Sequence, residues 1–240
     1  MTAGALLEVS ALGKRFGGFV ALESVDLSID ERQRVGLIGP NGSGKSTLVN
    51  CICGTLGYEK GSVRFAGHAL NGRSAHQRTR LGLARSFQLP RPFNTLSLAD
   101  NLRVPLLYSG RSGARPINEQ CMEVLRLVGL AEKSEHLPRD LTQIEMRKLE
   151  LARAMAANPR LLIADEAMAG LSHSEVDDIL ALLIRLNEQG VTIVMIEHIM
   201  RAVMHFSQRL VVLVAGRKIA DGNPADVVRD PGVVRAYLGE

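Results

Sequence analysis

Residues 39–47, GPNGSGKST, are the feature that most constrains what this chain can fold into. They follow an apolar run, VGLIG at 35–39, and lead into a segment with helical character. Glycines let the main chain close around an anion, and a helix N-terminus offers free amide groups to it. A strand, a glycine-rich turn and a helix in this order predict a loop that holds phosphate groups.

The loop matches the pattern G-x-x-x-x-G-K-[ST], which predicts binding of ATP together with Mg²⁺. Lys45 is expected to reach the β and γ phosphates, and the Ser46 hydroxyl to bind Mg²⁺. The other residues of the expected cradle are Gly39, Pro40, Asn41, Gly42, Ser43, Gly44 and Thr47. A chance glycine-rich turn is the alternative, since the bare pattern arises by accident in roughly one such chain per hundred. The strand before the loop and the helix after it disfavour that alternative.

Continuous apolar runs predict strands that are covered on both faces, as in a parallel sheet. Such runs lie at 35–39, 161–165, 191–197 and 210–216. Half-exposed antiparallel strands instead alternate apolar with polar residues or contain glycine. Segments of this second kind lie at 6–10, 19–29 and 61–70. We therefore expect a parallel core sheet with an antiparallel sheet beside it.

Helical periodicity separates these strands. Residues 175–189 place apolar side chains on one face and stop before Gly190, which predicts an amphipathic crossover helix. Helical segments around 98–108, 117–130 and 142–157 form an insertion of different character. The expected fold is an α/β P-loop NTPase with a parallel sheet, an antiparallel β flank and a helical insertion. It would be one domain over 6–238, with a helical subdomain at about 89–157.

A pair of carboxylates follows the apolar run LLIAD, at Asp165 and Glu166. Asp165 is expected to bind Mg²⁺, directly or through water, and Glu166 to polarise the water that attacks the γ-phosphate. An acidic pair after an apolar strand is commonplace by itself. Its combination with the phosphate-binding loop favours the functional interpretation.

Composition narrows the class of protein. The net charge of +4 comes from basic residues scattered among acidic ones, so charge does not indicate nucleic-acid binding. No apolar run approaches the roughly 20 residues of a membrane span, and the first ten residues do not form a signal peptide. The 3 cysteines form no CxxC pair, which fits a reducing cytosol.

Residues 141–157, LTQIEMRKLELARAMAA, followed by NPRLLIADE, resemble the signature helix and second acidic motif of ATP-binding-cassette (ABC) proteins. The resemblance runs over nearly the whole chain. It implies that Phe16 stacks on adenine, that Gln88 acts in catalysis and at Mg²⁺, and that His198 contacts the γ-phosphate. It also places AGLSHSE at 169–175 in the position of the D-loop. Taken alone, Phe16 is equally a core residue, Gln88 a solvated loop residue and His198 a satisfied strand-end histidine.

Within this family the chain is most similar to the ATPase subunits of bacterial importers of the branched-chain amino acid type. The segments that carry this similarity are SFQLPRPFNTLSLADNL at 86–102, DEAMAGLSHSEVDDI at 165–179 and IADGNPADVVRDPGVVRAYLGE at 219–240. The similarity implies a head-to-tail dimer with a paralogous or identical ATPase subunit at the cytoplasmic face of the membrane. It also implies two membrane permeases, fed by an extracytoplasmic solute-binding protein, and no nucleic-acid partner. Residues 89–108 would then meet a permease helix through Phe93, or Phe93 and Leu96 would simply pack the helical insertion.

The signature itself departs from the family pattern, since LTQIE stands where LSGGQ is usual. Thr142 keeps a hydroxyl for the partner subunit's ATP, but Thr142 and Glu145 also form a capping box. Ser172 replaces the D-loop aspartate and can cap the next helix with Glu175. One hypothesis is an asymmetric heterodimer, in which the ATP site completed by this signature is the weaker one. The other hypothesis is a symmetric homodimer.

Two functions other than transport remain as alternatives. The chain would then be a soluble ABC ATPase or a nucleotide-gated regulator.

Overall fold

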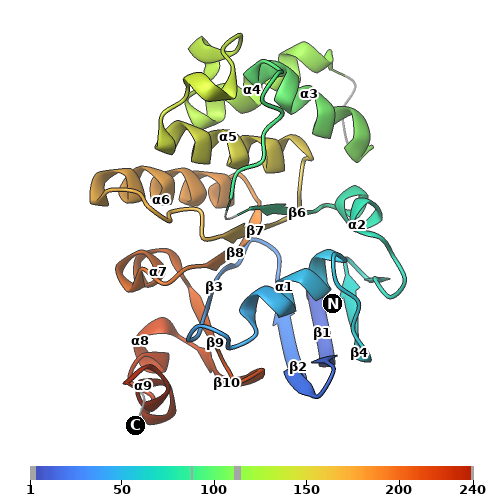
Figure 1. The fold of residues 1–240 in the computed structure, drawn as a ribbon, viewed down its shortest axis with the longest axis vertical. Coiled ribbons are helices and arrows are strands. Elements are labelled where there is room, and N and C mark those ends of the chain that lie inside the picture. Colours follow the sequence, from blue (N-terminus) through green and yellow to red (C-terminus); the bar gives the residue numbers. More distant parts are fainter. Residues whose placement is uncertain (1–3, 88, 111–114, 239–240) are drawn as a thin grey trace.

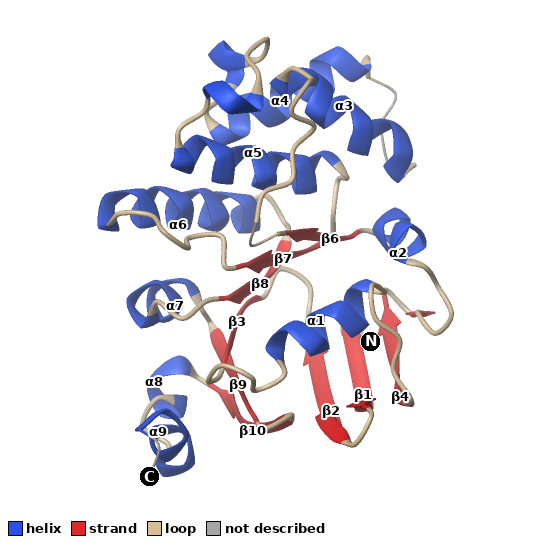
Figure 2. Cartoon of the chain, in the orientation of Figure 1, coloured by secondary structure: helices blue, strands red, loops and turns tan. Residues whose placement is uncertain are grey.

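The computed structural model describes residues 4–87, 89–110 and 115–238. A six-stranded sheet in the order β10-β9-β3-β8-β7-β6 lies at its centre (Figures 1 and 2). The strands are β3 (Arg34–Ile38), β6 (Leu83–Ser86), β7 (Leu161–Asp165), β8 (Thr192–Ile196), β9 (Arg209–Val214) and β10 (Arg217–Gly222). Neighbouring strands are parallel except β10, which is antiparallel to β9. The predicted parallel core sheet is confirmed, and each continuous apolar run forms one of its strands.

Side chains of β7 alternate between two apolar clusters. Leu162 and Ala164 pack on one face of the sheet, and Leu161 and Ile163 pack on the other. Both faces are covered, so the four positions 161–164 are all apolar and their sequence shows no alternation.

Helices α6 (His173–Glu188) and α7 (Met200–Phe206) cover the first face. Above α6 lies a layer formed by α3 (Leu98–Ser109), α4 (Ile117–Val128) and α5 (Gln143–Ala156) (Figure 1). Two short 3₁₀ helices, Ala131–Lys133 and Pro138–Asp140, connect α4 to α5. The four α-helices predicted from periodicity are confirmed, with ends that shift by one or two residues.

The second face is covered by α1 (Lys45–Cys53) and by an antiparallel sheet. That sheet has the order β2-β1-β4-β5. Its strands are β1 (Leu7–Phe16), β2 (Phe19–Ile29), β4 (Lys60–Phe65) and β5 (His68–Ala69). The antiparallel segment predicted at 61–70 forms two strands, because Ala66 and Gly67 both have positive φ and turn the chain into a hairpin.

Strands β6 and β10 and helix α2 (Ala75–Leu81) were not predicted. Strand β6 has 4 residues, LARS, and one of them is an arginine. Strand β10 is an edge strand, RKIADG, in which no position is fully buried. Short or edge elements bury too little apolar surface to leave a pattern in the sequence.

The C-terminal helices α8 (Pro224–Val227) and α9 (Pro231–Leu238) pack near the end of β3. Val233 of α9 belongs to the same apolar cluster as Ile38, the last residue of β3. One helical turn later, Tyr237 lies close enough to Gly39 for the Gly39 N–H to lower the pKa of its hydroxyl, against the effect of burial. The end of the chain therefore contacts the start of the glycine-rich loop. Within the described ranges no helix is both long and apolar enough to span a membrane.

Candidate nucleotide-binding site

The glycine-rich loop connects the end of β3 to the start of α1, as predicted. Gly39 and Gly44 have to be glycines because other chain segments approach them closely. A Cβ on Gly39 would lie 2.0 Å from the Leu213 carbonyl oxygen, and one on Gly44 would lie 2.7 Å from the Ala21 carbonyl oxygen. Gly44 also has φ of 102°, in the left-handed region that glycine adopts without strain. The loop is therefore held against β9 on one side and β2 on the other.

Lys45 folds back over the loop. Its Nζ donates hydrogen bonds to the carbonyl oxygens of Gly39, at 2.7 Å, and Pro40, at 3.0 Å. Burial lowers the pKa of Lys45, and the charges of Glu166 and Asp165 oppose this effect. The loop lysine and the acidic pair, far apart in sequence, therefore lie in one electrostatic environment.

Helix α1 is anchored at its other end by Arg78 of α2, which is buried. Arg78 Nη1 donates to the carbonyl oxygens of Cys51 and Ile52, both at 2.7 Å. Its Nη2 and Nε donate to the carbonyl oxygens of Leu70, at 2.9 Å, and Arg73, at 3.0 Å. A cation among the last carbonyls of a helix also complements the helix dipole. Arg78 therefore fixes the helix whose first turn carries Lys45 and Ser46.

Asp165 is buried at the end of β7 and forms an ion pair with Arg85 of β6, with Nη2 and Oδ2 2.5 Å apart. Arg85 Nη1 also donates to Asn50 Oδ1 of α1, at 2.6 Å. The guanidinium thus bridges the end of β7 and the helix that follows the loop. Sequence reasoning missed Arg85, and the available signal was a lone cation inside a strand that pairs with β7.

Glu166, the next residue, is half-buried and has φ of 47°. Its N–H donates to the Ile196 carbonyl oxygen of β8, at 2.9 Å. A non-glycine residue in this region is under backbone strain of about 1–3 kcal/mol, which the surrounding structure has to offset. Such strain is common where a side chain is held in a defined direction for function.

Glu197, at the end of β8, is a second carboxylate that sequence reasoning missed. It is buried, and its Oε1 accepts a hydrogen bond from the Met168 N–H at 2.9 Å. Its Oε2 has no hydrogen-bond partner among the described residues, and His198 Nδ1 lies 3.9 Å from it. Burial raises the pKa of Glu197. The His198 side chain is 70% exposed, so it is not part of the core.

Thr142 caps α5 as predicted. Its Oγ1 accepts from the Glu145 N–H, at 3.4 Å, while Glu145 Oε2 accepts from the Thr142 N–H, at 3.0 Å. Lys133 donates to Glu145 Oε1 at 2.6 Å and holds the pKa of that carboxyl below its usual range. Ser172 and Glu175 form the same box at the start of α6. Both capping boxes are confirmed, and each ends in a carboxylate.

Phe16 belongs neither to the loop nor to the ends of β7 and β8. Phe16 is at the end of β1, and its side chain is 49% exposed with Lys14 Nζ 5.2 Å from the ring centre. The alternative of a core phenylalanine is therefore wrong. Gln88 lies outside the described residues.

Comparison with known proteins agrees with this geometry. Residues 22–169 match the ABC transporter family model, and residues 217–240 match that of the branched-chain amino acid ATP-binding cassette transporter. The chain is 38% identical to the high-affinity branched-chain amino acid transport ATP-binding protein BraF of Pseudomonas aeruginosa, and 98% of each chain is covered. It is 35% identical to the high-affinity branched-chain amino acid transport ATP-binding protein LivG of Escherichia coli, and again 98% of each chain is covered.

Solved structures show the same fold. An ATP-binding cassette of an ABC transporter in its ADP conformation has a TM-score of 0.88 and 29% identity, covering 98% of this chain and 99% of its own. A dimeric post-hydrolysis cassette bound to ADP and phosphate has a TM-score of 0.80 and 26% identity. The match covers 91% of this chain and 98% of that cassette. The chain therefore belongs to the ABC transporter family, as an ATP-hydrolysing ATP-binding cassette.

Proposed function

We propose that this chain powers the uptake of branched-chain amino acids or related small solutes through partner permeases, from the cytoplasmic face of the membrane. The observation that carries the proposal is the convergence of Lys45, Asp165 and Glu166 around the loop at 39–47. The names of the relatives support transport over the alternative of a soluble ABC ATPase.

ATP would bind with its adenine on Phe16 and its phosphates against the amide groups of residues 39–47. Lys45 would leave the carbonyl oxygens of Gly39 and Pro40 and pair with the β and γ phosphates. Burial already lowers its pKa, so this cation gains most from an anionic partner. The remaining amide contacts would come from the loop and from Thr47.

Mg²⁺ would be held by Ser46, Asp165 and Gln88. Mg²⁺ is usually bound through one or two carboxylates together with substrate phosphates and water, and Asp165 would be the carboxylate here. Bound there, the ion neutralises charge that develops on the phosphates.

Glu166 would accept a proton from the attacking water, and His198 would donate a hydrogen bond to the γ-phosphate. The exposed position of His198 leaves its ring free to meet a nucleotide at the surface of the sheet. The backbone bond between Glu166 and Ile196 joins the ends of β7 and β8, which hold these two residues.

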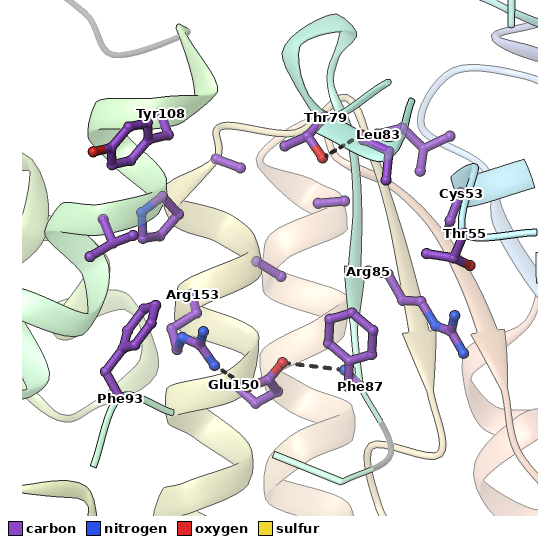
Figure 3. Close-up of a pocket in the computed structure, with 16 residues that line it drawn as sticks. Cys53, Thr55, Thr79, Leu83, Arg85, Phe87, Phe93, Tyr108, Glu150 and Arg153 are labelled. Carbon is purple, nitrogen blue, oxygen red and sulfur yellow. Dashed lines mark hydrogen bonds and ion pairs between the residues drawn. The ribbon is translucent and has the colours of Figure 1, made fainter. Parts of the chain in front are cut away.

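The permeases would dock in a groove of about 280 Å³ between α3, α5 and β6 (Figure 3). Its lining includes aromatic side chains that stay exposed, at 46% for Phe87, 42% for Phe93 and 73% for Tyr108. Exposed apolar groups gathered in a groove indicate a binding surface for an amphipathic helix. This favours the permease interpretation of Phe93 over simple packing of the helical layer.

The second cassette of the dimer would be a paralogue. The start of α5 offers the partner's ATP the carboxylate of Glu145, which Lys133 keeps ionised, and Thr142 is already used as a cap. A carboxylate near a γ-phosphate is unfavourable, so the site completed by this α5 would be the weaker one. Comparable losses of ATPase activity from Glu166→Gln here and from the matching change in the partner would contradict this asymmetry.

The test of the function is reconstitution of this chain with the permeases that co-purify with it. Glu166→Gln is expected to keep ATP binding and to lower both ATP hydrolysis and solute uptake by about 100-fold or more. Arg64→Lys, a change on the exposed side of β4, is the control. Recovery of the chain with no membrane partner, or uptake that continues in Glu166→Gln, would refute the proposal.

A further inference from the structure

Arg85 connects two features that the proposed function treats separately: the Mg²⁺ ligand Asp165 and the groove in Figure 3. Its side chain is 13% exposed, and its guanidinium is shared between Asp165 of β7 and Asn50 of α1. The third nitrogen, Nε, is buried with no hydrogen-bond partner among the residues that the structure describes. Two charge-assisted bonds therefore determine where this group lies.

Those two bonds bridge the expected ligands of the ion. Asn50 lies one helical turn after Ser46 on α1, so the Arg85 bridge sets the distance between α1 and Asp165. Mg²⁺ requires nearly ideal octahedral geometry at short distances and tolerates little displacement of its ligands. A planar guanidinium holds two acceptors in fixed directions, which a lysine ammonium cannot do.

The groove reaches this bridge through Phe87. The Arg85 guanidinium carbon lies 5.3 Å from the centre of the Phe87 ring, a distance at which cation and ring attract each other. The Phe87 N–H donates to Glu150 Oε1 at 3.4 Å, and Glu150 Oε2 accepts from Arg153 Nη1 at 2.9 Å. Arg153 in turn lies 5.3 Å from the Phe93 ring. Contacts thus run without a gap from the exposed rings of the groove to Asp165.

We propose that Arg85 is a positioning residue that holds Asp165 at the right distance from α1, and that the Phe87 ring holds the Arg85 guanidinium in this bridge. The role of Asp165 as a ligand of Mg²⁺ rests on the proposed function, whereas the contact between Arg85 and Phe87 is a property of this chain alone.

The experiment uses the purified chain, Mn²⁺ as the probe for Mg²⁺, and ADP, so that no turnover occurs. The electron paramagnetic resonance signal of free Mn²⁺ decreases as the ion binds to the chain with ADP, and this decrease gives the dissociation constant of Mn²⁺. Arg85→Lys is expected to raise that constant by roughly 2- to 12-fold, the range for one net hydrogen bond. Phe87→Leu is expected to raise it by roughly 2- to 5-fold, since it removes the ring but keeps an apolar side chain.

The double variant decides whether Phe87 acts through Arg85. It is expected to bind Mn²⁺ with ADP no more weakly than Arg85→Lys alone, because the bridge is already lost. Arg64→Lys is the matched control, an arginine on the exposed side of β4 that lies 3.8 Å from Glu8 and donates to the Gly67 carbonyl oxygen at 2.8 Å, away from the site. Wild-type affinity in Arg85→Lys, or losses that multiply in the double variant, would overturn the proposal. Failure to recover a permease would contradict the proposed function and leave this measurement intact.

Discussion

Replacement of Arg78 tests how much the anchoring of α1 contributes to the fold. Arg78 is 4% exposed and donates to four backbone carbonyls, two of them at the end of α1. Arg78→Met keeps most of the apolar stem and removes all of these donors. Hydrogen bonds to a charged donor contribute about 1.5–3 kcal/mol each, and the orphaned carbonyls regain only part of this by admitting water.

The expected loss is about 3–5 kcal/mol in the free energy of unfolding, because four backbone carbonyl oxygens lose a buried, charged donor. For a chain of this size that loss corresponds to a melting temperature lower by roughly 6–20 °C. Urea unfolding followed by circular dichroism measures it, and Arg80→Met, on an exposed arginine of α2, is the control. A loss below about 1 kcal/mol for Arg78→Met would show that water replaces the guanidinium and would refute the reasoning.

Three further changes have defined outcomes. Burial raises the pKa of Glu197 above its ordinary value, so the stability it contributes is present at low pH and is lost as pH rises through the raised pKa. Glu197→Gln should therefore gain stability relative to wild type in urea titrations as pH is raised from about 5 to about 8. A free energy of unfolding that falls relative to wild type over this range would contradict the reasoning. Tyr237→Phe removes the oxygen that lies near the Gly39 N–H, so hydrogen exchange at that amide should accelerate about 2- to 12-fold if the two groups interact; unchanged exchange would mean that the contact contributes nothing. Glu145→Gln should raise ATP hydrolysis by the assembled dimer at least about 2-fold if its charge opposes the partner's nucleotide, and equal rates would exclude this effect.

The apolar runs predicted the parallel strands because both faces of the sheet are covered, and the capping boxes predicted the starts of α5 and α6 because they are local. Arg85 and Glu197 could not be found in this way. Each lies beside the site only because parallel strands bring their carboxyl ends together, and a single charged residue in a strand has no periodic signature. The contact from Tyr237 to Gly39 spans almost the whole chain, so no local pattern could predict it.

The helical layer shares one continuous apolar cluster with α6 and with the first face of the sheet. Leu102 of α3, Leu149 of α5, Ile179 of α6 and Ile193 of β8 all belong to it. Lifting the layer off α6 would expose this cluster to water and would carry a large positive heat-capacity change. Any movement of the layer during an ATP cycle is therefore a shear, in which packed side chains slide over α6 by small steps and the apolar interface stays closed.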